Sequence, residues 1–341
     1  MTSRNRYFLI GALLVLVAGL GVGVVAYYTG ALPGSPAARL NGPAELRYVP
    51  ADASLVAYAD VRGVMQSRFR QQMLKVEPDE QGRRQFEAKT GIDVQRDIDH
   101  VVACVTPGTG ADRADRSSGL VLASGRFDQA KIAALLQEKG AQKESYGGVD
   151  LFTQEASGHM AGLEGGPHWG LAFLAPGTVA IGSLRLVKSA IDLRNGRGAN
   201  VTSNAELMKL IRANDQGTTW AVGRFDQLRE QARIPDQVAS RIPPITWFSV
   251  AGHVDDGISG TLRAETRDDQ AAENLRQVVQ GFVALARMQA GSQPDLASVL
   301  QSVQLSGTGR EVSLSFAVPA RVLERIPGAD HRRDGDQHPR P

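Results

Sequence analysis

Cysteine is almost absent from this sequence. The one thiol, Cys104, excludes any disulfide within the chain. It lies in the apolar run His100-Val-Val-Ala-Cys-Val-Thr106, where a cysteine is usually a small core residue. A bridge between two chains would need an exposed thiol, which this run does not favour.

Charge of one sign is not in excess either. The 38 Lys and Arg residues nearly balance the 36 Asp and Glu residues, and the formal net charge of +2 comes without a polybasic block. We therefore expect no nucleic acid partner and no strongly anionic partner surface. A content of 42% hydrophobic and 22% charged residues is typical of folded proteins and excludes disorder throughout.

Signatures of the common enzyme classes are missing. Neither Gly-x-Ser-x-Gly nor Ser-x-x-Lys occurs, and there is no Walker phosphate-binding sequence. The run Gly108-Thr-Gly-Ala-Asp-Arg113 begins like a dinucleotide-binding loop, but the third glycine is absent and a polar loop follows. We therefore assign no catalytic residue and no cofactor, and we lean away from an enzyme.

The histidines and the acidic clusters do not form a metal site. The six histidines are His100, His159, His168, His253, His331 and His338. The least unfavourable metal proposal joins His159, His168 and Glu164 in the glycine-rich stretch 158–170, which a mobile surface insertion explains more simply. The acidic clusters are Asp93, Asp97 and Asp99, which lack the spacing of a calcium loop, and Asp255 and Asp256, which sit beside His253 at a predicted hairpin tip.

One long apolar run does stand out, from Phe8 to Tyr28. Its twenty-one residues carry no charge and no proline, and as a helix they are about 30 Å long, enough to cross a bilayer. The alternative is a cleaved secretory signal, whose apolar region is shorter and ends in small residues, not in Tyr27-Tyr28. Arg4 and Arg6 precede the run, so the positive-inside rule keeps the N-terminus in the cytoplasm.

These features divide the chain into five expected segments. They are a cytoplasmic tip (1–7), a transmembrane helix in the cytoplasmic (inner) membrane (8–28), a Gly/Pro/Ala-rich tether (29–45), an extracytoplasmic, periplasmic α+β domain (46–326) and a disordered polar tail (327–341). The sequence leaves open whether the domain is one sheet or two lobes meeting near 195–203. Gly19 and Gly23 have the spacing of a helix-pairing motif, although glycine is common in membrane spans.

The domain has an α+β pattern with mostly antiparallel sheets. Strands are expected over 54–59, 101–106, 120–124, 171–174, 178–181, 218–222, 246–254, 258–265, 303–305 and 312–316. Helices are expected after Asp60 as far as Val76, from Asp128 to Gly140, over 184–193, and over 205–212 with Ser203 and Glu206 as a capping box. Repeated strand–helix–strand–strand units are the expected building block.

A long helix is expected after the strand over 258–265, with Thr266 and Asp269 as its caps. Its large apolar residues recur at helical spacing, and we expect them to form a buried stripe. They are Leu275, Val278, Val279, Phe282, Leu285 and Met288.

The pentapeptide Gly-Arg-Phe-Asp-Gln occurs twice, at 125–129 and at 223–227, each time between a predicted strand and a predicted helix. The repetition indicates an internal duplication. The pairs Arg126/Asp128 and Arg224/Asp226 could contact a partner. A strand-ending Gly, a packed Phe and a helix-capping Asp explain every position except the Arg, and we prefer this structural interpretation.

Two runs carry a resemblance to a known class. They are Tyr48-Val-Pro-Ala-Asp-Ala-Ser-Leu-Val-Ala-Tyr-Ala-Asp60, directly after the apolar run and tether, and Phe86-Glu-Ala-Lys-Thr-Gly-Ile-Asp-Val-Gln-Arg-Asp-Ile-Asp99. With them the sequence resembles uncharacterised bacterial envelope proteins that are anchored at the N-terminus and carry a domain of unknown function. The resemblance covers mainly residues 48–130. It implies an envelope-anchored α+β domain of repeated units, and no functional residue transfers.

From this topology we expect a single-pass envelope protein whose extracytoplasmic domain is a non-catalytic binding module. Its expected partners are the lipid bilayer, through residues 8–28, and either another envelope protein or a second copy of itself. One alternative is an exported hydrolase or metal-dependent enzyme whose site is assembled from distant residues. Another is a small-ligand-binding or sensory domain.

Overall fold

The computed structural model describes residues 42–68, 87, 92–107, 117–155, 168–227, 243–290 and 294–319. The predicted tip, transmembrane helix and tail lie outside these residues. None of the helices within the described ranges has the length and apolarity needed to span a bilayer.

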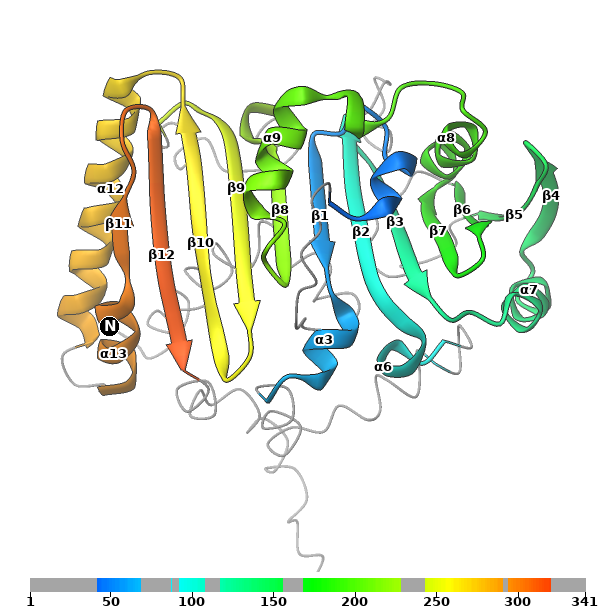
Figure 1. Ribbon diagram of the computed structural model, residues 1–341, viewed down its shortest axis with the longest axis horizontal. Coiled ribbons are helices and arrows are strands. Elements are labelled where there is room, and N and C mark those ends of the chain that lie inside the picture. Colours follow the sequence, from blue (N-terminus) through cyan, green and yellow to red (C-terminus); the bar gives the residue numbers. More distant parts are fainter. Residues whose placement is uncertain are drawn as a thin grey trace, which may run out of the picture.

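The described residues form an α+β fold around one twelve-stranded sheet (Figure 1). The strands are β1 (Leu55–Ala59), β2 (Ile98–Pro107), β3 (Ser117–Gly125), β4 (Gln142–Tyr146), β5 (Val149–Glu155), β6 (His168–Ala175), β7 (Thr178–Ser183), β8 (Thr219–Arg224), β9 (Ile245–Val254), β10 (Gly257–Thr266), β11 (Gln304–Ser306) and β12 (Glu311–Pro319). Their order in the sheet is β11-β12-β10-β9-β8-β1-β2-β3-β7-β6-β5-β4. Every neighbouring pair is antiparallel, so the expected α+β class with antiparallel pairing is confirmed, and the strands form one continuous sheet.

Helices pack along both faces of this sheet. They are η1 (Ala44–Tyr48), α3 (Val61–Gln66), α6 (Val94–Asp97), α7 (Gln129–Glu138), α8 (Leu184–Arg194), η3 (Val201–Ser203), α9 (Ala205–Asn214), α12 (Asp269–Gln289) and α13 (Pro294–Ser302). The main core lies where η1, α8 and α9 cover the middle strands, and it includes Tyr58 stacked on Trp220. Alternate residues of the same strands face α3, α6 and α7 on the other side, because successive side chains of a strand point to opposite faces.

The predicted hairpins are confirmed where local turn residues specify them. β6 and β7 flank Pro176-Gly177, and Gly177 has a positive φ of 75°. β9 and β10 meet at the turn before Gly257, and β11 and β12 form the last hairpin. The sequence interpretation missed the β4–β5 hairpin, whose turn glycines Gly147 and Gly148 have φ values of 56° and 78°, as a two-residue hairpin turn requires. It also missed α13.

Two predicted helix caps were wrong, one by one position and the other by two. Asn204, and not Ser203, caps α9 by accepting a hydrogen bond from the backbone N–H of Leu207. Asp268 caps α12 by accepting from Ala271, whereas the hydroxyl of Thr266 bonds backbone carbonyls. Both Asn204 and Asp268 have the extended backbone that a cap requires.

Three predicted boundaries also need correction. The helix expected to run from Asp60 to Val76 ends at Gln66, because Ser67 is extended, and residues 69–76 lie outside the described ranges. The predicted tether, 29–45, extends too far, since Glu45 is buried within the domain. The predicted glycine-rich insertion, 158–170, also extends too far, since His168 to Gly170 belong to β6.

Candidate interaction surface

The helix α12 packs beside the end of the sheet, against β10, β12 and α13 (Figure 1). Its buried residues are small: Ala271 and Ala272 at the start and Ala290 just past the end are at most 4% exposed. Val283 and Ala286, half-buried, continue the same line along the helix. The helix therefore packs against the sheet through its alanine-rich face.

The predicted buried stripe was wrong for four of its six members, whereas Leu275 and Val279 are half-buried. Val278, Phe282, Leu285 and Met288 are 39%, 59%, 45% and 81% exposed. At about 100° per residue, they lie roughly 80–160° around the helix from the line that contacts the sheet. Within the described residues, these four account for the large hydrophobic side chains that are exposed. We refer to them as the α12 stripe.

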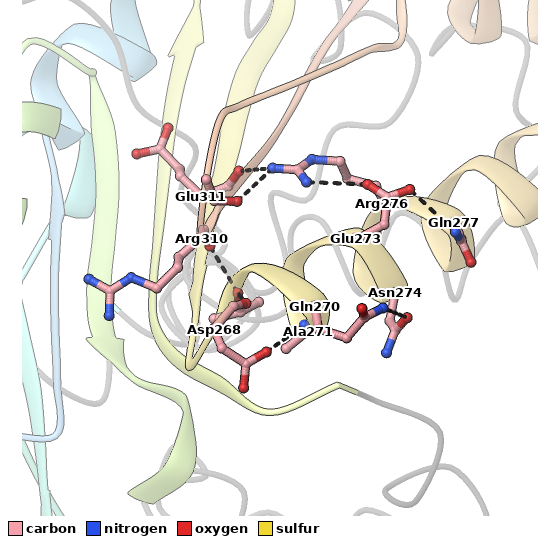
Figure 2. Close-up of polar contacts among 11 residues, drawn as sticks. Asp268, Gln270, Ala271, Glu273, Asn274, Arg276, Gln277, Arg310 and Glu311 are labelled. Carbon is pink, nitrogen blue, oxygen red and sulfur yellow. Dashed lines mark hydrogen bonds and ion pairs between the residues drawn. The ribbon is translucent and has the colours of Figure 1, made fainter.

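Polar contacts fix the first half of α12 to its neighbours, as Figure 2 shows. Arg276 donates to the backbone carbonyls of Gly309 and Glu311, at 2.9 and 3.0 Å, and pairs with Glu273. Farther along, Arg287 donates to the carbonyl of Leu300 on α13 at 3.2 Å. The helix is therefore held on its polar side while the stripe faces solvent.

A second feature is a buried polar cluster beneath η1. The hydroxyl of Ser124 donates to Glu45 Oε1 at 2.5 Å, and His100 Nε2 lies 3.0 Å from Glu45 Oε2. Neither His100 Nε2 nor Glu45 Oε2 has a hydrogen-bond partner among the described residues. The side chains of His100 and Glu45 are 16% and 10% exposed, and the ring of Tyr58 lies 5.7 Å from the imidazole.

This cluster is structural in character. Its serine donates to the carboxylate and not to the imidazole, so the arrangement differs from a nucleophile activated by a histidine. Burial alone would raise the pKa of Glu45, but the contacts with His100 and Ser124 outweigh it and lower the pKa to about 2. The carboxylate is therefore an anion at neutral pH, and it joins η1 to β2 and β3.

We expect Glu45 to make the domain sensitive to acid. A folded-state pKa of about 2 against an ordinary 4.5 means that its contribution to stability is complete above about pH 4.5 and is lost as the pH falls toward 2. Glu45→Gln should remove this part of the pH dependence. Urea unfolding of both proteins between pH 6 and 2.5 measures it, and parallel curves would contradict the expectation.

The histidines and acidic groups singled out in the sequence do not converge. His100 is in the buried cluster, His253 is exposed near the β9–β10 turn, and His168 is in β6. His159 and Glu164 lie outside the described residues. Over the part of the chain that the structure describes, no three His, Cys, Asp or Glu residues are placed to hold a metal ion.

Each member of the first acidic cluster has a structural partner. Asp93 caps α6, Asp97 accepts from the backbone N–H of Asp93, and Asp99 pairs with Arg62 on α3. Cys104 is buried, as predicted, and burial raises its pKa to about 12, so the thiol is unreactive at neutral pH. The loop at 108–113 lies outside the described residues.

The two copies of the pentapeptide use their charges differently. In the first, Asp128 caps α7 as predicted, and Arg126 donates to the carbonyl of Arg96. In the second, Arg224 pairs with Asp226 at 2.6 Å and lies over the ring of Trp247. Local contacts thus account for both arginines, and the copies do not present matching charged pairs.

Comparison with known proteins adds little. No family model matches this sequence, and no curated protein matches it. Among solved structures, one titled "Structure of crystal form I of TP0453" aligns with 83% of this chain and 95% of that chain, at 10% identity and a TM-score of 0.46. A similarity of this degree establishes neither a family nor a shared activity.

Proposed function

We propose that this chain is a membrane-anchored, extracytoplasmic binding module of the bacterial envelope, and that the α12 stripe is its binding surface. The exposure of the stripe is the observation that carries the proposal. Four large apolar side chains in a row present on the order of 400 Å² to solvent, a size at which an apolar patch on a single protein is often functional.

The polar groups of the buried cluster and of α12 already contact other groups of the chain, which supports a binding role over a catalytic one. The cluster that most resembles a catalytic constellation, around Glu45, is largely buried, and its carboxylate accepts from Ser124 and faces His100. The arginines of α12 are bonded to neighbouring carbonyls. The stripe therefore offers shape and apolar area, which favours recognition of another protein surface.

The anchor and the repeated units belong to the same proposal. The apolar run 8–28 would hold the domain at the membrane, and residues 29–41 would leave it only a short reach. The sheet order supports repetition, because β1-β2-β3-β7-β6 on one side of the centre mirrors β8-β9-β10-β12-β11 on the other, with α7 and α12 following β3 and β10. In this correspondence the pentapeptides follow β3 and β8, which are not equivalent strands.

The proposal is tested by crosslinking in intact membranes, followed by affinity capture of the full chain and mass spectrometry. Phe282→Glu adds a charge to the centre of the stripe, and Gln280→Glu adds the same charge to an exposed position on the other side of α12. We expect the wild type and Gln280→Glu to capture the same partner, and Phe282→Glu to lose it. Equal capture by all three would overturn the proposal.

A further inference from the structure

We infer that the partner of the α12 stripe is the α12 stripe of a second copy of this chain, with the two helices crossing antiparallel at Gly281 and Phe282. This inference rests on the proposed function and names its partner.

The spacing is that of a helix–helix seam. Val278, Phe282 and Leu285 follow one another at intervals of four and three residues, and Met288 continues at three. Alternation of this kind keeps a row of side chains on one line of a helix and lets them interlock with a facing helix. The partner surface that fits such a row best is itself a helix.

The shape of the stripe is complementary to itself. Phe282 projects into solvent, and the adjacent Gly281 is bare: a Cβ placed there would meet nothing within 4 Å. In a two-fold, antiparallel crossing at this point, the ring of each copy lies over the exposed backbone of the other. A parallel pair would instead set ring against ring and glycine against glycine.

Charge also favours a second copy. A two-fold contact places identical residues near one another, so charges beside the stripe would repel. Arg276 and Arg287 are both bonded to carbonyls on the opposite flank of the helix. The positions next to the stripe, Gln277, Ala284 and Gln289, are uncharged. A helix that lies on an anionic membrane would carry Lys and Arg along these positions instead.

The area sets the strength of the contact. Two stripes of about 400 Å² bury roughly 800 Å² in total, which is below the size of stable complexes and typical of weak ones. We therefore expect a dissociation constant of roughly micromolar order for free domains. Anchoring both copies in one membrane raises their effective concentration and favours the pair.

Disulfide crosslinking of the full chain in its membrane tests this geometry. Val278 and Leu285 stand symmetrically on either side of Gly281 and Phe282, so an antiparallel pair brings Val278 of one copy to Leu285 of the other. Two differently tagged chains, one with Val278→Cys and one with Leu285→Cys, are produced together and oxidised. The native Cys104 is buried and gives no background. We expect the mixed crosslink to exceed either self-crosslink at least about fivefold.

Controls separate this inference from the proposed function. The mixed crosslink should disappear with Phe282→Glu in both chains and persist with Gln280→Glu. The inference is overturned if Val278→Cys crosslinks more strongly to itself than to Leu285→Cys. It is also overturned if the mixed crosslink persists with Phe282→Glu, which is the result that pairing through Gly19 and Gly23 would give. Two further results without the mixed crosslink overturn the inference. One is stripe-dependent capture of a different protein, and the other is stripe-dependent binding to vesicles of phosphatidylethanolamine and phosphatidylglycerol. The capture result leaves the proposed function standing, whereas vesicle binding alone does not.

Gly281→Ala should change stability and association in opposite directions. Alanine is the better helix former at this exposed position and has room for its Cβ, so we expect the melting temperature of the full chain to rise by about 1–4 °C. The added methyl group stands where the ring of the partner would lie, so the yield of the mixed crosslink should fall severalfold. An unchanged yield would contradict the crossing point.

Discussion

Glu45→Ala is expected to lower the free energy of unfolding by about 3 kcal/mol, because the substitution removes the carboxylate that two largely buried polar groups contact. The hydroxyl of Ser124 loses its acceptor, and the imidazole of His100 loses the carboxylate that faces it. Ser124 is buried, and the side chain of His100 is only 16% exposed. Urea unfolding of the full chain in detergent micelles at pH 7, followed by tryptophan fluorescence, measures the loss.

Two variants serve as controls for this result. Glu45→Gln keeps an acceptor for Ser124 and should lose less stability than Glu45→Ala. Arg47→Ala changes an exposed residue on the same short helix and should cost less than about 1 kcal/mol. If Glu45→Ala unfolded like Arg47→Ala, the buried cluster would not join η1 to the sheet as described.

Phe282→Glu is expected to weaken self-association of the chain by at least about 100-fold. Loss of a central aromatic residue from an interface commonly costs 2 kcal/mol or more, and each two-fold pair contains the residue twice. The new carboxylate would also lie against the apolar stripe of the other copy, where it has no counter-charge. Energy transfer between two labelled populations of the full chain, reconstituted in lipid vesicles over a range of densities, measures the association.

The folded state should not be the cause of this loss. Phe282 is 59% exposed, so the substitution removes little packing within one chain, and the melting temperature should stay within about 2 °C of the wild type. Gln280→Glu should associate like the wild type. Normal association of Phe282→Glu would mean that the stripe is not the contact between copies.

Local signals explain which parts of the fold were predictable. The turns at Pro176-Gly177 and Asp256-Gly257 specify their hairpins through residues adjacent in the chain, and both hairpins were predicted. The β4–β5 hairpin has an equally local signal in Gly147-Gly148. It was missed because the exposed edge strand β4 carries no alternating apolar pattern.

The buried Glu45 cluster and the α12 stripe depend on contacts between residues that are distant in the sequence. Glu45 and Ser124 are 79 residues apart, and nothing near either one indicates the other. The helical spacing of the apolar residues in α12 did predict a long helix, but this spacing shows only which residues share the apolar face of the helix. It does not show which part of that face meets the sheet. Here Ala271 and Ala272 are buried, and the four residues of the α12 stripe are exposed.

The most direct test of a covered α12 stripe is the rate at which Met288 is oxidised by hydrogen peroxide in intact membranes. Met288 is 81% exposed on a single chain, whereas Met208 is 2% exposed and provides a slow internal reference. We expect Met288 to react nearly as slowly as Met208 in the wild type, and at least about fivefold faster in Phe282→Glu. Fast oxidation of Met288 in both proteins would show that the stripe is open in the membrane and would contradict the proposed binding surface.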